Sequence, residues 1–398
     1  MKTATAWSTI NDAEAAIAAT YDQLITRLGG TPNLLLLHGS VTYDWERVLA
    51  HLGVLAPGVP VHGGTSCLGI MTEEGFHSNQ GVGMGLFGII DTVGSYGVSA
   101  VSAGTDARAA ATQATQHALQ QAGREGEIPA MVWITTVPGH EEQVIKGIED
   151  VLGDNVPISG GSSGDNTVTG EWSQFANGQV YRDAVVVMVM FPGTEVQFAF
   201  HSGYEPTHHK GRVTRATGRT LYEIDGRPAA VVYNEWIGGA LTDVLESGGN
   251  ILARTSLHPL GRVVGATGGF PYFMLAHPDR MTAEGALTLF ADVVAGDELV
   301  LMEGTPASLV SRAGRVAAAA LQNGDAQPKK ISGALVIYCA GCMLTVQPRM
   351  EEVVDSLRQV LGGKPILGTF TFGEQGCFAG GENRHGNLMI SVLVFYED

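Results

Sequence analysis

Three loops of this chain combine glycine with hydroxyl side chains, a composition suited to binding a small ligand. Each loop follows a proline and a short apolar run, at residues 60–66, 157–163 and 365–371. Small residues expose backbone N–H groups, and hydroxyls add donors for a carboxylate or another anion. In and just after these loops we predict the ligand-binding residues Gly63, Gly64, Thr65, Ser66, Gly160, Gly161, Ser162, Ser163, Asp165, Thr371, Gly373 and Glu374. The alternative is that the glycines only permit tight β turns.

Two of these residues, Asp165 and Glu374, are carboxylates that follow the second and third loops. Near one cleft they could bind the ammonium group of a ligand. The alternative, which is more common for a single carboxylate after a loop, is that each caps the N-terminus of a helix.

Cysteines form the second candidate site. Cys339 and Cys342 lie at the end of an apolar strand, and Cys377 follows the next glycine-rich loop, so the three could converge at one sheet edge. Three thiolates would suit Zn or Cu(I), and a single thiolate could bind haem iron. The alternative is that Cys339 is a small buried apolar residue and the others are incidental. A thioredoxin-like redox pair is less favoured, because such a pair usually opens a helix in a different βαβ context.

Catalysis and nucleotide binding are not indicated. A hydrolase would need a nucleophile with a base and an orienting group in reach, and we recognise no such arrangement in the sequence. No Gly-Lys-Ser/Thr or Gly-x-Gly-x-x-Gly pattern follows a predicted strand either. We therefore expect a binding protein and not an enzyme.

The three loops belong to a repeated unit of the chain. Apolar strands precede them at residues 34–37, 131–134 and 335–338, and further strands follow at 82–90, 184–191 and 388–395. Helical patterns occupy 11–28, with Asn11 as the expected cap, and also 44–52, 105–123, 141–152 and 307–322. The pattern predicts an α/β fold of mixed β-sheets flanked by helices, built from repeated β-α-β-loop-β modules. Ligands bind beyond the carboxyl ends of strands in such sheets, where these loops would lie.

The composition changes at residues 203–212, where Gly203, Pro206 and Gly211 surround a polar segment, and this change predicts a domain boundary. We therefore expect two domains, at residues 1–202 and 203–398. With 398 residues and 44% hydrophobic residues, the chain is long and apolar enough for more than one core.

The chain is acidic, with 23 Lys and Arg against 40 Asp and Glu, which gives a formal net charge of −17. This charge repels nucleic acid and anionic membrane surfaces, so we expect neither as a partner. The apolar stretches are far shorter than the roughly 20 residues that span a bilayer. The first residues lack the apolar region of a signal peptide. The sequence therefore predicts a cytoplasmic protein.

Several segments in order along the chain resemble the FIST family, a prokaryotic sensory module with an N-terminal and a C-terminal half. The matching segments cover roughly residues 30–398 and include 160–165, 174–178, 203–206, 211–216, 224–229, Tyr233, 339–341 and 368–374. One departure is that Cys342 stands where the family usually carries an arginine shortly after Cys339-Ala340-Gly341. A soft sulfur thereby replaces a guanidinium that could hold a carboxylate.

The resemblance implies signal transduction by reversible binding of a small molecule, with amino acids or similar metabolites as proposed ligands, and no catalysis. It also implies an alternative, because some FIST proteins bind haem, sense nitric oxide and act on separate histidine kinases or cyclic-di-GMP enzymes. A third possibility, which comes from the cysteines of this chain, is cysteine-ligated Zn or Cu. We see no output domain in the sequence, so we expect the protein to act on a separate partner.

Overall fold

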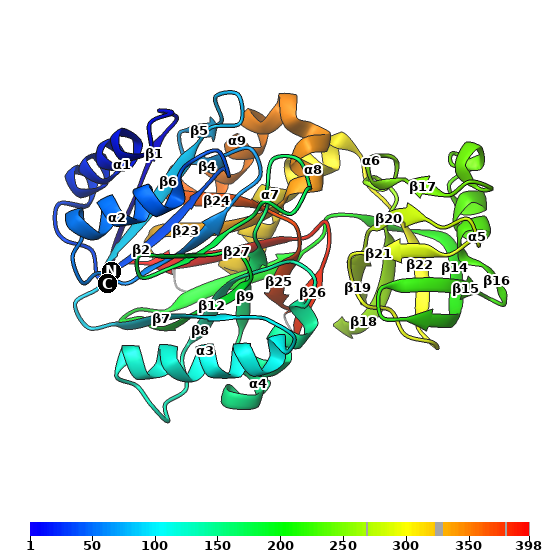
Figure 1. Ribbon diagram of the computed structural model, residues 1–398, viewed down its shortest axis with the longest axis horizontal. Helices are drawn as coiled ribbons and strands as arrows, with labels where there is room; N and C mark the ends of the chain where they lie inside the picture. Colours follow the sequence, from blue (N-terminus) through cyan, green and yellow to red (C-terminus); the bar gives the residue numbers. More distant parts are fainter. Residues whose placement is uncertain (268–269, 323–328, 379, 398) are drawn as a thin grey trace.

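The computed structural model describes residues 1–267, 270–322, 329–378 and 380–397. Four β-sheets organise the chain (Figure 1). Helices cover the sheets and connect their strands: α1 (Ala13–Leu28), α2 (Trp45–Leu55), α3 (Ala107–Ala122), α4 (Glu141–Leu152), α5 (Ala229–Trp236), α6 (Leu252–Thr255), α7 (Pro306–Gln322), α8 (Ala340–Val346) and α9 (Met350–Leu361). Two short 3₁₀ helices, η1 (Thr242–Val244) and η2 (Gln347–Arg349), complete the helical elements described. None of these helices has both the length and the apolar character that a membrane-spanning helix needs.

Three of the sheets have six strands each. The first contains, in order, β1 (Lys2–Ser8), β6 (Met84–Ile90), β2 (Leu34–Gly39), β3 (Val61–Thr65), β10 (Gln174–Ala176) and β11 (Gln179–Tyr181). The second contains β26 (Asn383–Gly386), β25 (Glu374–Cys377), β9 (Ile158–Ser162), β8 (Met131–Thr136), β12 (Ala184–Phe191) and β7 (Ser95–Ser102). The third contains β13 (Val196–His201), β27 (Ile390–Tyr396), β23 (Ile331–Cys339), β24 (Ile366–Thr371), β4 (Ile70–Thr72) and β5 (Gly75–His77).

The predicted repeat is confirmed by these sheets. In each, a strand before a glycine-hydroxyl loop runs parallel to the strand that enters the loop: β2 with β3, β8 with β9, and β23 with β24. The strand after the loop pairs antiparallel to the first of these: β6 with β2, β12 with β8, and β27 with β23. The predicted α/β class with mixed sheets is therefore correct. The strands β2 and β8 are buried along their whole length, and β23 is buried except at the half-buried Ile331, as the apolar runs 34–37, 131–134 and 335–338 indicate.

Each module lends a β-hairpin to the sheet of another module. The hairpin β10–β11 of the second module pairs with β3 of the first. The hairpin β25–β26 of the third module pairs with β9 of the second, and β4–β5 of the first module pairs with β24 of the third. This cyclic exchange joins the three sheets into one unit, which we call the three-sheet body; it contains β1 to β13 and α7 to β27.

The fourth sheet forms a separate lobe beside the three-sheet body (Figure 1), which we call the β domain. Its strands are β17 (Gly249–Asn250), β20 (Pro278–Met281), β21 (Leu287–Leu289), β15 (Thr220–Ile224), β14 (Glu205–Thr217), β22 (Glu298–Glu303), β18 (Leu260–Thr267), β19 (Phe270–Ala276) and, paired with β15, β16 (Arg227–Pro228). The predicted boundary at residue 202 lies between β13 and β14, where the chain enters this lobe. The chain returns to the three-sheet body at α7.

Local sequence signals explain most helix ends. Asp12, one residue beyond the expected Asn11, caps α1 by accepting a hydrogen bond from the backbone N–H of Ala15 at 2.9 Å. Gly29 ends this helix in the left-handed conformation, with φ of 73°.

A core shared by the two parts, which includes Leu275 and Met302 of the β domain and Tyr338 of β23, fixes the β domain against the third sheet.

Candidate functional site

A cavity of about 490 Å³ lies between the three-sheet body and the β domain. It opens at the carboxyl ends of β23 and β24, where ligands bind in parallel α/β sheets. The three-sheet body contributes Pro138, Glu141, Val168, Trp172, Cys339, Gly341, Leu344, Thr345, Thr371, Phe372, Gly373, Glu374 and Asn387. The β domain contributes Arg219, Asn250, Leu252, Ala253, Ser256, His277 and Phe290. A molecule in this cavity would therefore contact both parts of the protein.

The cavity wall is largely apolar and aromatic. Trp172 and Phe372 meet edge to face with ring centroids 6.1 Å apart, and His277 and Phe290 do the same at 6.2 Å. Pockets of this size with apolar walls and a few polar groups are typical of small-molecule sites. The wall suits a ligand with an apolar body and a small number of polar atoms.

Glu374 is a buried carboxyl group of the cavity wall, as is Glu141. Glu374 accepts hydrogen bonds from the Thr371 hydroxyl at 2.8 Å and from the backbone N–H of Met389 at 3.0 Å. Burial raises the pKa of Glu374 to about 8 in spite of these two bonds. At neutral pH the group is mostly protonated, and a cation beside it would favour the charged form.

A second polar cluster joins the two parts at the edge of the cavity. Arg219, between β14 and β15, donates to Glu141 at 2.6 Å and to Glu142 at 2.8 Å, both at the start of α4. His385 of β26 lies 3.1 Å from Glu142 through Nδ1, and its Nε2 is 4.0 Å from Glu141. Among the described residues, Glu141, Glu142 and His385 are also the group whose ligand atoms lie close enough to hold a metal ion. Arg219 already supplies the positive charge there, so we interpret the cluster as an ion-pair latch.

The carboxylates and the basic groups of this latch shift each other's pKa values. Burial opposes the charged forms, yet the pKa of Glu141 and that of Glu142 are lowered because His385 and Arg219 lie beside them. The pKa of His385 is raised by the same two carboxylates, although burial alone would lower it. The latch therefore holds the Glu141 and Glu142 carboxylates against the Arg219 guanidinium and the His385 ring, in a buried contact between α4, β26 and the β domain.

The first two glycine-hydroxyl loops lie elsewhere, at the junction of the three sheets, where they bond to one another and to neighbouring chain. The backbone N–H of Thr65 donates to Ser173 O at 2.8 Å, and that of Gly164 donates to Thr65 O at 2.9 Å. The residues of these loops that we predicted as ligand-binding are buried: Gly63, Gly64, Thr65, Ser66, Gly160, Gly161, Ser162 and Ser163. None of them is among the residues that line the cavity, whereas Thr371, Gly373 and Glu374 of the third loop are.

Close packing explains the glycines of the junction. A Cβ atom at Gly64 would come within 2.6 Å of Thr135 Cγ2 and 2.8 Å of Ser163 Oγ. A Cβ atom at Gly161 would come within 2.4 Å of Thr371 Cγ2. At Gly64 and Gly161 the first two loops thus use glycine for the close approach of the three sheets.

Asp165 organises the loop at 165–171. Its carboxylate accepts hydrogen bonds from the backbone N–H groups of the residues Thr167, Val168, Thr169, Gly170 and Glu171. Val168 of this loop and the adjacent Trp172 line the cavity. Asp165 therefore shapes the cavity wall indirectly.

Two family models match consecutive stretches of the chain, and their boundary lies within the β domain. The FIST N domain model matches residues 33–227, and the FIST C domain model matches residues 229–377. The chain belongs to the FIST family. FIST domains are sensory domains of signal transduction. The resemblance found in the sequence is therefore confirmed.

Individual relatives add little detail. An uncharacterized protein of Methanocaldococcus jannaschii is 37% identical over 92 residues, which are 23% of this chain and 18% of that protein. The match thus spans less than a fifth of this relative. Cyanuric acid hydrolase from A. caulinodans matches with 11% identity and a TM-score of 0.34, over 98% of each chain. PurLQS from Thermotoga maritima matches with 9% identity and a TM-score of 0.23, over 76% of this chain and 72% of that one.

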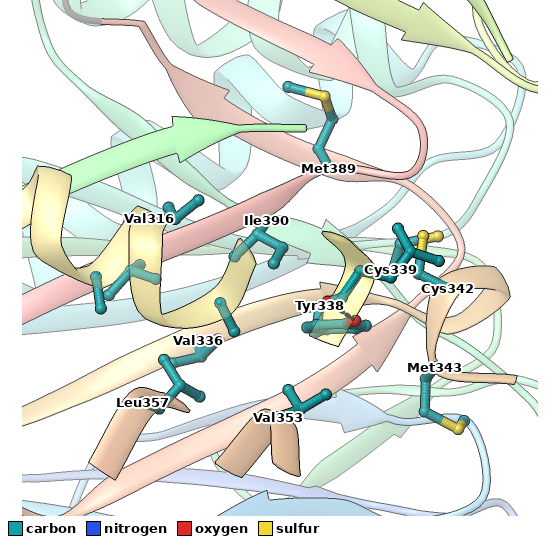
Figure 2. Close-up of a cluster of buried hydrophobic side chains, with 14 of the residues drawn as sticks. Val316, Val336, Tyr338, Cys339, Cys342, Met343, Val353, Leu357, Met389 and Ile390 are labelled. Atoms are coloured by element: carbon teal, nitrogen blue, oxygen red, sulfur yellow. Dashed lines mark hydrogen bonds between the residues drawn. The ribbon is translucent and has the colours of Figure 1, made fainter. Parts of the chain in front are cut away.

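The cysteines of this FIST protein are all buried free thiols. Cys339 lines the cavity, and Cys342 lies beside it in α8 (Figure 2). Cys377, on β25 of the second sheet, donates to the carbonyl of Phe378 at 3.5 Å. The sulfurs of Cys339, Cys342 and Cys377 are not among the potential metal-ligand groups found within the described chain.

The cavity does not fit haem or a thiolate-bound metal well. His277 is the histidine on its wall, and Nε2 of this ring is 2.9 Å from the Thr255 hydroxyl in a buried contact. Burial raises the pKa of Cys339, which disfavours a thiolate at this position. We derive no function from either group.

Several cavity residues were not predicted from the sequence. Arg219 and His277 come from the β domain, and Asn387 comes from the turn after β26. No local motif marks them, because their role depends on how the β domain packs against the third module.

Proposed function

We propose that this protein is a sensor that reversibly binds an amino-acid-like metabolite in the cavity between the three-sheet body and the β domain. The observation that supports this most is the position of the cavity, because Glu374 of one part and His277 of the other both line it. A ligand that binds better to one arrangement of the two parts shifts the equilibrium toward that arrangement. The family's sensory role agrees with such a mechanism.

The proposed ligand orientation follows from the wall. The ammonium group would lie at Glu374, whose buried carboxyl group becomes charged beside a cation. The apolar part would lie against Trp172 and Phe372. Arg219 is already paired with two carboxylates, so we assign it to the latch and not to the ligand.

A thermal-shift screen with amino acids and related amines tests this proposal. A genuine ligand should raise the melting temperature of the wild type and have no effect on Leu344→Trp, because Leu344 lines the cavity and its own exposed fraction of 42% leaves room for a larger side chain to fold. Val54→Trp is the matched control, since Val54 lies on α2 with 77% exposed. Ligands that stabilise all three proteins equally would refute the cavity as the binding site.

We also propose that binding occurs without chemical conversion. Although we predicted no hydrolase motif, Ser162 stands at the centre of Gly160-Gly161-Ser162-Ser163-Gly164, a Gly-x-Ser-x-Gly spacing that some hydrolases use for a nucleophile. Its hydroxyl is fully buried and donates to Glu141 at 2.7 Å, and it is not part of the cavity wall. Recovery of an unchanged ligand after prolonged incubation, measured by mass spectrometry, is the expected result; a stoichiometric product would contradict it.

The output is proposed to be a separate cytoplasmic protein, with a histidine kinase or a cyclic-di-GMP enzyme as the candidates implied by the family. The test is autophosphorylation or cyclic-di-GMP turnover by a purified partner, with and without this protein and its ligand. A ligand-dependent change that disappears in Leu344→Trp would support the assignment, and equal rates under all conditions would refute it.

A further inference from the structure

Arg312 of α7 is a buried cation in an unusual environment. Its side chain is fully buried, and its Nη1 donates to the carbonyls of Ser202 and Leu388, each at 2.7 Å. Its Nε and Nη2 have no hydrogen-bond partner among the residues that the structure describes. The guanidinium carbon lies 4.8 Å from the ring centre of Tyr338 and 5.8 Å from that of Tyr204. A buried charge is costly unless an opposite charge lies close by.

Cys342 is the group placed to supply that opposite charge. The ionisable groups that act on Arg312 most strongly are, in order, Cys342, Tyr338, Tyr204 and Cys339. Burial raises the pKa of both tyrosines, so their phenols stay neutral. Burial also disfavours a thiolate at Cys342, but a hydrogen bond from Cys339 and the charge of Arg312 outweigh it and lower the pKa of Cys342 to about 6. The surroundings of Cys342, with the Tyr204 hydroxyl 3.5 Å from its sulfur, thus favour a thiolate opposite the Arg312 guanidinium.

Cys339 connects this pair to the cavity. It ends β23 and directly precedes α8, so the Cys-x-x-Cys segment does open a helix between the parallel strands β23 and β24. The sequence did not lead us to expect this context. The two sulfurs lie next to each other (Figure 2), and Cys339 lines the cavity wall. A small oxidant in the cavity reaches Cys339 while Cys342 stays fully buried behind it.

We propose that Cys339 and Cys342 form a reversible disulfide when a hydroperoxide enters the cavity, so that the pair is a redox switch. The shared proton moves from Cys339 to Cys342, and the Cys339 sulfur attacks the peroxide. The O–O bond breaks, Cys339 becomes a sulfenic acid, and the departing oxygen takes the proton from Cys342 and leaves as an alcohol or as water. The Cys342 thiolate then attacks the Cys339 sulfur, and hydroxide leaves as the S–S bond forms. Two electrons pass from the sulfurs to the peroxide.

The structural consequence lies at the connection between β13 and β14. A disulfide removes the negative charge that faces Arg312, whose Nη1 holds the carbonyl of Ser202 in this connection. Gly203 packs against the same side chain, since a Cβ atom there would come within 2.7 Å of Arg312 Cβ. The Tyr204 hydroxyl lies 3.5 Å from Cys342 Sγ. Oxidation is thus expected to loosen residues 202–204, and this inference does not depend on any metabolite ligand.

The test is thiol counting on the full chain after brief treatment with hydrogen peroxide, with peptide mass mapping. The wild type has four cysteines and should retain two free thiols, with a loss of two hydrogens in the peptide that holds residues 339–342. Cys377→Ser is the matched control and should still form this disulfide. Cys339→Ser keeps the thiolate opposite Arg312, so it should fold, and it should form no disulfide.

Hydrogen exchange provides the second readout. Peroxide should increase exchange at residues 202–204 at least severalfold in the wild type and in Cys377→Ser, and leave it unchanged in Cys339→Ser. Dithiothreitol should reverse the change. Four intact thiols in the folded wild type after peroxide treatment, or irreversible oxidation of Cys339 without a disulfide, would overturn the proposal.

Discussion

The latch between the two parts makes Arg219→Met the most informative single substitution. Arg219 has 23% of its side chain exposed, while Glu141 has 1%. Removal of one partner from a buried ion pair costs about 3–5 kcal/mol. Because Arg219 is partly exposed and His385 remains beside the carboxylates, we expect a loss near the lower end, about 3 kcal/mol in the free energy of unfolding at pH 7.

The same substitution should change how stability depends on pH. In the wild type the pKa of Glu141 and that of Glu142 are lowered on folding, so their contribution is present above the unfolded-state pKa and is lost as the pH falls through the folded-state values. Without Arg219, both pKa values rise relative to those of the wild type, because one of the two cations is lost while His385 remains. The difference between variant and wild type should therefore shrink as the pH is lowered toward about 4.

Urea unfolding followed by circular dichroism at pH 7 and pH 4.5 measures both effects. The control is Arg215→Met on β14, because the Arg215–Glu223 pair has 60% and 33% of its side chains exposed. Exposed pairs contribute about 0–1 kcal/mol. If Arg219→Met proves as mild as Arg215→Met, or if its effect does not change with pH, the interpretation of the latch as a buried ion pair is wrong.

Three further predictions concern other buried groups. The pKa of His385 is raised on folding, so its contribution to stability is complete below the unfolded-state pKa and is lost as the pH rises through the folded-state pKa. The urea midpoint of the wild type should therefore fall above about pH 6.5. His385→Asn should make this fall less steep. Burial raises the pKa of Glu374 to about 8, so the free energy of unfolding should fall as the pH rises from about 4.5 to about 8. Glu374→Gln should remove this pH dependence in urea titrations. An unchanged pH dependence in the variant would refute the assignment. Gly161→Ala should reduce the free energy of unfolding by about 1–3 kcal/mol and so lower the melting temperature, because the added Cβ would overlap Thr371. Gly53→Ala on α2, which has nothing within 4 Å of the added atom, should instead raise it slightly.

The sequence predicts the modules well but not how they exchange hairpins. Apolar runs such as 34–37 and 131–134 are buried strands because each fills the centre of a sheet covered on both faces. The pairing of β4–β5 with β24 joins residues almost 300 positions apart, and no local pattern encodes a contact of that range. Figure 1 shows the result as one body built from both ends of the chain.

Only part of the candidate site could be predicted, again because long-range contacts decide which loop lines the cavity. All three loops combine glycine with hydroxyl residues, yet only the third faces the β domain, and so Thr371, Gly373 and Glu374 line the cavity. The first two loops meet at the junction of the sheets, where glycine permits close approach. Whether a loop lines the cavity or packs at the junction depends on where the β domain is inserted, and the loop sequences do not encode that position. Cys342 illustrates the same limit, because its partner Arg312 lies on a different helix.

The cyclic exchange of hairpins also constrains how the chain can fold and be divided. No module completes its own sheet: without the third module, β9 lacks its neighbour β25 and the hairpin β4–β5 has no strand to join. Contacts of such long range close large loops, which slows folding. We therefore expect the amino-terminal part to remain unfolded or to aggregate until the last strands leave the ribosome, and fragments cut between β13 and β14 to become soluble only when they are produced together.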